Sequence, residues 1–226
     1  MSKTANPAAR TIALTLQRRI VDGTYPGGMP IRQAEVATEF GVSHIPVREA
    51  LASLAQGGLV DIQPNRGAVV TTLSADQCLE LAEMRVALES IALKHSMKRL
   101  SAKDLVAARQ ALARGAKADS LEERSQWNWA FHRLLHAGAA RPFLLSQLET
   151  LWKHADRYLH YTWKNAHYEA RSDSEHEELL AAVAAKDEHL ALRLNKRHIL
   201  GAATVAIDLI KTNEVAEQGE IGRAHV

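Results

Sequence analysis

The pattern of hydrophobic and polar positions divides the chain into two regions. In residues 7–22, apolar side chains recur every three or four positions and stop at Gly23, which predicts an amphipathic helix. The same spacing predicts short helices over 32–40 and 44–56. From about residue 75 onward, long helical patterns follow one another. The chain therefore predicts a compact region of short elements followed by a helical one.

Turn residues in the first region stand where its elements must change direction. Gly41 can cap the end of one helix and Ser43 the start of the next, which leaves only a short turn between them. Two β-branched runs, LVDIQ and AVVTT, flank the turn PNRG and predict a β-hairpin. Helix, helix, short turn, helix and hairpin is the order of a winged helix-turn-helix, whose third helix enters the DNA major groove.

The predicted third helix separates an apolar face from an exposed one. Four apolar residues at helical spacing are expected to face the core: Val47, Ala50, Leu51 and Leu54. The outer N-terminal face then carries Ser43, His44, Ile45 and Arg48. An arginine there can donate to guanine or phosphate, and a helix N-terminus with a hydroxyl can bind phosphate. The alternative, a surface arginine on a helical hairpin, leaves the order of elements unexplained.

The second region predicts six helices, near 75–99, 101–118, 121–139, 142–165, 169–185 and 188–212. Their expected N-caps are Ser74, Ser101, Ser120 and Asp187. The core stripe of the first is predicted to be Leu79, Ala82, Val86, Leu93 and Met97. We expect a mostly α fold, with a winged helix-turn-helix and its small β-hairpin over 1–74 and an antiparallel all-α bundle over 75–215.

Composition and charge fit a soluble protein of the cytoplasm. The single cysteine, Cys78, excludes an internal disulfide and fits a reducing compartment. No apolar run is long enough to cross a bilayer, and the N-terminus lacks the apolar segment of a signal peptide. Residues 1–74 hold seven Lys/Arg and five Asp/Glu, so the net charge of +2 lies entirely there. This excess alone is too small to indicate nucleic acid.

Three of the eleven histidines have a context that favours a shared site. His132 follows Asn128 by four residues on one helix face, while His176 and His198 fall in the last two predicted helices. Facing helices of a bundle can bring such side chains to one metal ion, but three histidines on three helices are more often separate positions than one site. Six others are interpreted as surface or satisfied core histidines: His95, His136, His154, His160, His167 and His189.

The motifs of the first region resemble the GntR family of bacterial transcription regulators. GTYPGGM, EVATEFGVS, PVREAL, GGLV and NRGAVV carry the resemblance over residues 18–73. It implies DNA contacts by Ser43, His44, Ile45 and Arg48, by Arg32 near the preceding helix, and by Arg66 with Gly67 at the wing tip. His44 and Ile45 stand where the family commonly has arginine and threonine, which leaves open the base pairs that are read.

The second region resembles the FCD ligand-binding domain of the FadR subfamily, through RVALESIA, WAFHRLL and SEHEELLAAV. Six helices place it nearer the vanillate-regulator branch. In FCD domains an aspartate and three histidines bind a divalent metal, and the matching positions here are Asn128, His132, His176 and His198. The neutral asparagine leaves metal affinity open. Three imidazoles and an oxygen favour zinc or nickel over calcium or magnesium.

Together these features predict a homodimeric regulator that binds double-stranded operator DNA and is not an enzyme. A small organic acid is the expected effector, bound at the metal and by the guanidinium of Arg85 or Arg157. Either arginine could instead form a surface salt bridge. One alternative is a DNA-binding regulator whose pocket no longer senses an acid, consistent with Asn128. A metal-dependent hydrolase is a remote one, because no general base is evident beside the predicted ligands.

Residues 216–226 are expected to form a disordered tail. The last seven residues, EIGRAHV, match the in-frame translation of a common sequencing adapter. We interpret the sequence after about Gly219 as an assembly artefact, a hypothesis that genomic resequencing tests. An intact gene that ends in these codons would disprove it.

Overall fold

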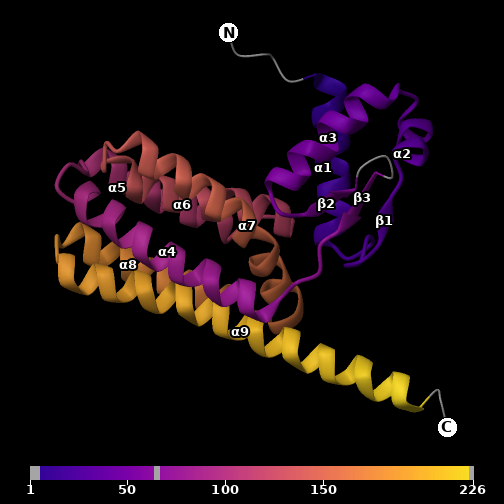
Figure 1. Cartoon of the computed structure of the whole chain (residues 1–226). Helices are drawn as coiled ribbons and strands as arrows, with labels where there is room; N and C mark the ends of the chain where they lie inside the picture. Colours follow the sequence, from indigo (N-terminus) through magenta and orange to yellow (C-terminus); the bar gives the residue numbers. More distant parts are fainter. Residues whose placement is uncertain (1–5, 64–66, 224–226) are drawn as a thin grey trace. The chain divides into compact units, whose positions relative to one another are not determined.

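The computed structural model describes residues 6–63 and 67–223, with side chains described only as far as residue 214. It contains two compact units, Met1–Leu73 and Ser74–Val226 (Figure 1). Each unit has its own buried core, and the fold class predicted from the sequence is confirmed.

The first unit is a winged helix-turn-helix. Its helices are α1 (Pro7–Val21), α2 (Gln33–Phe40) and α3 (His44–Gln56). A three-stranded antiparallel sheet of order β1-β3-β2 joins β1 (Pro30–Ile31), β2 (Val60–Gln63) and β3 (Gly67–Val70). The hairpin of β2 and β3 is the predicted wing, whereas the two-residue β1 was missed because it is too short to show an alternating pattern.

The turn between α2 and α3 forms as the sequence indicates. Gly41 adopts a left-handed conformation with φ of +63°, which ends α2. Ser43 occupies the N-cap position of α3, but its side chain makes no capping hydrogen bond. All four residues predicted to face the core from α3 are buried, so the orientation of the recognition helix is confirmed.

Gly67, at the start of β3, has a conformation and a neighbour that both require glycine. Its φ is +103°, and a Cβ there would lie 2.2 Å from the carbonyl oxygen of Ile31. Gly28 offers a matched control, because its φ is +83° but a Cβ there would have nothing within 4 Å.

We therefore expect Gly67→Ala to lower the free energy of unfolding of the first unit by about 3 kcal/mol, and Gly28→Ala by about 1 kcal/mol. The larger loss combines backbone strain with the clash against Ile31, while Gly28→Ala adds strain alone. Hydrogen exchange followed by mass spectrometry on first-unit peptides measures both losses. Equal losses would show that β1 moves away and relieves the clash.

The second unit is formed by six helices within its described residues, as predicted. They are α4 (Ala75–Ser96), α5 (Ala102–Gly115), α6 (Leu121–Ala137), α7 (Pro142–Ala166), α8 (Glu169–Ala184) and α9 (Glu188–Arg223). The last helix continues well past the predicted end at residue 212, into the segment expected to be disordered. The run EVAEQ (residues 214–218) is rich in helix-forming residues, which agrees with this extension.

All four predicted N-caps of this unit are confirmed. The hydroxyls of Ser74, Ser101 and Ser120 each accept a hydrogen bond from a backbone N–H in the first turn of α4, α5 or α6. Asp187 accepts one from the N–H of Leu190 at the start of α9.

The core stripe of α4 differs from the prediction. Leu79 is 45% exposed, and the buried stripe starts one residue earlier, at Cys78. Its members are Cys78, Ala82, Arg85, Glu89, Ala92, Leu93 and Ser96. Two charged residues, Arg85 and Glu89, therefore lie in the middle of a core-facing stripe. Helix α4 contacts α6, α7 and α9 (Figure 1). Both charged side chains are buried.

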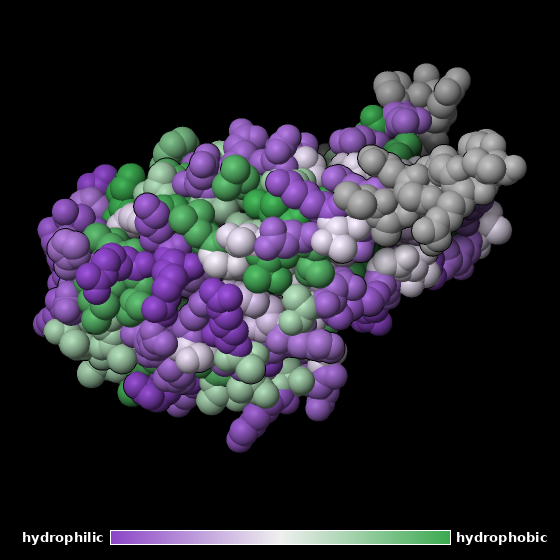
Figure 2. Space-filling model, turned by 90° about the horizontal axis from the view of Figure 1, so that it is seen from below, coloured by the Kyte–Doolittle hydropathy of each residue, from purple (hydrophilic) through white to green (hydrophobic). Residues whose placement is uncertain are grey.

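The surface of the molecule mixes polar and apolar side chains. On the face shown in Figure 2, hydrophobic patches alternate with hydrophilic residues. Among the described residues, none of the helices combines the length and apolar character that a membrane span requires.

Candidate functional site

The charged residues of α4 form a buried ion pair. Glu89 has no exposed surface, and its Oε1 accepts hydrogen bonds from Arg85 Nε and Trp152 Nε1, both at 2.9 Å. Burial by itself would raise the pKa of Glu89, but the charge of Arg85 and the hydrogen bond from Trp152 hold that pKa below its ordinary value. The carboxylate is therefore ionised in the interior of the bundle.

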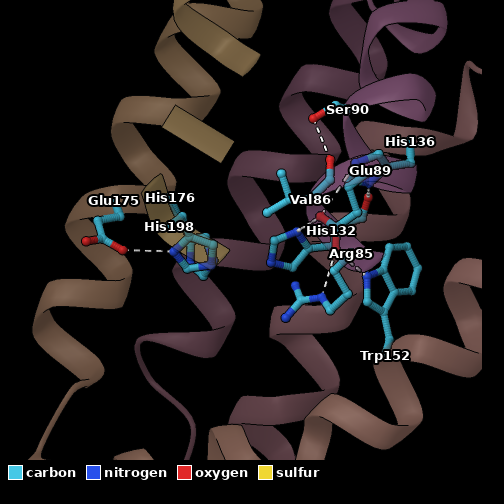
Figure 3. A network of polar contacts seen from close by, with 10 residues as sticks. All are labelled: Arg85, Val86, Glu89, Ser90, His132, His136, Trp152, Glu175, His176 and His198. Atoms are coloured by element: carbon cyan, nitrogen blue, oxygen red, sulfur yellow. Dashed lines mark hydrogen bonds and ion pairs between the residues drawn. The ribbon is translucent and has the colours of Figure 1, made fainter. Parts of the chain in front are cut away.

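The three histidines predicted as metal ligands converge beside this pair (Figure 3). His132 on α6, His176 on α8 and His198 on α9 each offer a ring nitrogen within 4.8 Å of the others, and all three are buried. The Nε2 atoms of His176 and His198 are 3.0 Å apart. Three separate helices thus bring their imidazoles close together, where a metal ion could bind.

Hydrogen bonding orients the ring of His198 toward this point. Its Nδ1 lies 2.9 Å from Oε2 of Glu175, and an ionised carboxylate can only accept, so Nδ1 carries the proton. The lone pair is then on Nε2, which faces His176. Glu175 is itself held by Arg171 and Tyr168. A carboxylate behind a histidine is the usual support of a metal ligand.

Burial keeps the histidines in the form that binds metal. It lowers the pKa of His132 and of His176 well below the ordinary value of 6.5. Both rings are therefore neutral at neutral pH, and a neutral imidazole has the lone pair that a metal requires.

Asn128, the fourth predicted ligand, lies on α6 one turn before His132 and is buried. Its Oδ1 has no hydrogen-bond partner within the described part of the chain. A buried oxygen without a partner is costly, and a cation is one group that would satisfy it. Its coordination of the ion stays a prediction.

A second group of possible ligands shares His132. Glu89, His132 and His136 also offer atoms within 4.8 Å of one another. The interpretation of His136 as a surface or satisfied histidine is wrong, because it has no exposed surface and its Nε2 has no hydrogen-bond partner among the described residues. The signal for it was the spacing of His132 and His136, which places both on one helix face.

The predicted effector-binding arginines differ in their surroundings. Arg85 is bound to Glu89 and lines a cavity of about 30 Å³ together with Tyr158 and Thr162. Arg157 is half-buried and does not line that cavity. A buried water occupies roughly 10–15 Å³ on this measure, so the cavity has room for about two waters. An organic acid would therefore require side chains to move.

The predicted DNA-binding residues of α3 are exposed. Ser43, His44, Ile45 and Arg48 all face solvent, with Ile45 65% exposed. Arg48 forms no ion pair with the described residues, and it lines a surface hollow of about 390 Å³ between α3 and the wing. Arg32 is exposed and pairs with Glu35 at 3.1 Å. Arg66 lies outside the described residues, and Gly67 is buried at the start of β3.

Comparison with known families decides what these two units are. Residues 8–70 match the gntR family of bacterial regulatory proteins, and residues 80–201 match the FCD domain. The chain belongs to the GntR family. Its FCD domain places it in the FadR subfamily, so it is a DNA-binding transcription regulator and not an enzyme.

Individual relatives agree with this assignment. The HTH-type transcriptional regulator YdhC of Bacillus subtilis is 28% identical over 191 residues, which cover 82% of this chain and 83% of YdhC. The HTH-type transcriptional repressor RspR of Escherichia coli is 25% identical over 196 residues, 85% of this chain and 86% of RspR. A GntR-family regulator of Pseudomonas syringae has a crystal structure with a TM-score of 0.57 at 26% identity, covering 96% of this chain and 91% of that one.

Proposed function

We propose that this regulator is a homodimeric repressor that leaves its operator when a small organic acid binds at a metal ion. The observation that carries the proposal is the convergence of His132, His176 and His198, which are buried and closely spaced. Three imidazoles suit zinc or nickel, and the oxygen of Asn128 would complete the set. The repressor RspR, a relative along most of its length, supports the direction of regulation.

The acid would bind at open coordination positions of the ion. A carboxylate is a good ligand for such a position, and Arg85, which lines the nearby cavity, could bind its other oxygen. Because the cavity is only water-sized, the acid would have to open the bundle. A ligand that binds the opened arrangement more tightly shifts the population toward it, and this shift would lower affinity for DNA.

DNA recognition would use two copies of α3. A two-fold dimer presents two recognition helices, which fit an inverted repeat with half-sites about one helical turn apart. The exposed Ile45 would contact a thymine methyl group, and Arg48 would reach guanine or phosphate.

We expect Arg48→Ala to weaken binding to the operator by about 10–100-fold, since a good arginine contact to guanine is worth roughly 1–3 kcal/mol. Fluorescence anisotropy with an operator selected from random duplexes measures the affinity at fixed salt. Arg141→Ala is the control, because it removes an exposed arginine from the FCD domain. An unchanged affinity for Arg48→Ala would contradict the docking of α3 in the groove.

Thermal unfolding of the full chain against a panel of small organic acids tests the proposed sensing. With zinc or nickel present, one acid should raise the midpoint by an amount that grows with its concentration, and the same acid should release operator DNA. The effect should vanish after chelation and in His132→Gln. The amide of the same acid is the matched control, since it lacks the carboxylate.

A pocket that no longer senses an acid is the competing function, and Asn128 in place of the family's aspartate is the observation that favours it. It predicts metal binding and operator binding that no acid alters. An acid-independent midpoint across the panel, with metal present, would support it and contradict the sensor.

A further inference from the structure

We propose that Glu89, His132 and His136 form a second binding position for a transition-metal ion, and that this position competes with the three-histidine position for His132. The proposed ligands share only His132 with the three-histidine position. It does not depend on an effector or on the direction of regulation.

Three unsatisfied atoms carry the proposal. Glu89 Oε2, His132 Nδ1 and His136 Nε2 are all buried and have no hydrogen-bond partner within the described residues. Glu89 Oε2 lies 3.8 Å from each of the two nitrogens. These distances are too long for hydrogen bonds between the three groups. A single cation between them would satisfy all three atoms at once.

The hydrogen bonds on the far sides of these groups orient them as ligands. His136 Nδ1 lies 2.6 Å from the carbonyl oxygen of His132, which can only accept, so Nδ1 carries the proton and Nε2 carries the lone pair. The other carboxylate oxygen of Glu89 is held by Arg85 and Trp152. Outer hydrogen bonds of this kind fix ligand orientation in metal sites.

The separations fit a transition metal after a small adjustment. Ligand atoms about 2.0–2.1 Å from a tetrahedral zinc lie roughly 3.3 Å apart, so the 3.8 Å separations must close by about half an ångström. Two imidazoles and one carboxylate favour zinc, cobalt or nickel over calcium or magnesium. A buried water that bridges the same atoms is the competing occupant, and metal titration separates the two.

The two positions compete because both require the imidazole of His132. Figure 3 shows His132 between the His176–His198 pair and Glu89, so its ring takes part in both groups of ligands. A neutral imidazole has one lone pair and one N–H, and its Nδ1 is the atom nearest Glu89. A neutral His132 can therefore bind only one ion at a time. The protein would hold one ion, shared between two positions.

Titration of the full chain with Co²⁺ tests this proposal, with equilibrium dialysis for stoichiometry and visible absorption for coordination. Wild type should bind one Co²⁺ per chain. His198→Gln should still bind one ion, with a changed spectrum, because it removes a ligand only from the three-histidine position. Adding His136→Gln to His198→Gln should weaken that binding at least tenfold, since even supporting groups around a metal are worth about 10–100-fold in affinity.

His160→Gln is the matched control, because His160 is buried on α7 and belongs to neither group of ligands. It should bind Co²⁺ as wild type does, and far-ultraviolet circular dichroism confirms that each variant is folded. If His198→Gln does not fold, His176→Gln serves the same purpose.

Equal, weak binding by His198→Gln and by the double variant would overturn the second position. That result would leave the three-histidine site and the proposed sensing intact. Two ions per wild-type chain would overturn the competition. Absence of Co²⁺ binding in wild type would overturn the second position and would also contradict the metal-dependent function.

Discussion

Glu89→Leu is expected to lower the free energy of unfolding of the FCD domain by about 3–5 kcal/mol, the typical loss when one partner of a buried ion pair is removed. The substitution leaves the guanidinium of Arg85 without its carboxylate in a position that is 8% exposed. It also removes the acceptor of the Trp152 indole N–H. Both groups would then be buried without their principal partner.

Urea unfolding followed by tryptophan fluorescence measures this loss in the FCD domain. All four tryptophans lie in the FCD domain, at positions 127, 129, 152 and 163, so the signal does not report on the winged helix-turn-helix. A chelator in the buffer removes any contribution from lost metal.

The double variant Arg85→Met/Glu89→Leu is the control. It replaces both charges with apolar groups of similar length, and such replacements are often neutral or stabilising. It should regain most of the stability lost in Glu89→Leu. A single variant that loses less than about 1 kcal/mol would show that Arg85 reaches water once its partner is gone.

The winged helix-turn-helix could be predicted from sequence because its signals are local. Gly41 and the caps fix helix ends, and the two β-branched runs around a tight turn mark the hairpin of β2 and β3. The first strand, β1, has no such signal, since two residues pair with β3 only when the chain is folded. The helices and the hairpin could therefore be predicted from local sequence, whereas β1 depends on tertiary pairing.

The metal site could be predicted only in part. Helical spacing places His132 on a face of α6, but no local rule says that α8 and α9 turn His176 and His198 toward it; the family resemblance supplied that. Glu89 was not recognised as part of the site. Its role depends on the buried side chains around it, and the sequence does not show which side chains those are. Arg85, predicted to bind an effector, is bound to Glu89 in the structure.

Burial of His132 and His176 makes the stability of the metal-free FCD domain depend on pH. Burial holds the pKa of His132 and His176 below 6.5, whereas in the unfolded chain both rings titrate near that value. Below about pH 6.5 the unfolded chain therefore binds more protons than the folded one. Both histidines thus favour folding above this pH, and their contribution declines as the pH falls.

Zinc or nickel is expected to stabilise the wild-type FCD domain by about 2.7 kcal/mol at a free concentration 100 times Kd and about 4.1 kcal/mol at 1,000 times Kd, because the folded state alone has the ligands in place. Tryptophan fluorescence in urea, with and without chelator, measures the difference. His132→Gln should abolish nearly all of it, since His132 belongs to both groups of ligands. Loss of only a small part would mean that the ion binds without this ring.

Asn128→Asp is expected to strengthen metal binding at the three-histidine position, whereas His132→Gln abolishes it. A carboxylate binds a divalent ion more strongly than a neutral amide, so the variant should reach the same stabilisation at lower metal concentration. Without metal it should be less stable than wild type, because the oxygen at this buried position has no hydrogen-bond partner within the described residues and a carboxylate would be buried unpaired. The variant should therefore gain metal affinity but lose stability without metal. A substitution that only disturbed packing would lower stability without raising affinity. A variant that is destabilised without metal and gains no affinity would show that residue 128 does not coordinate the ion.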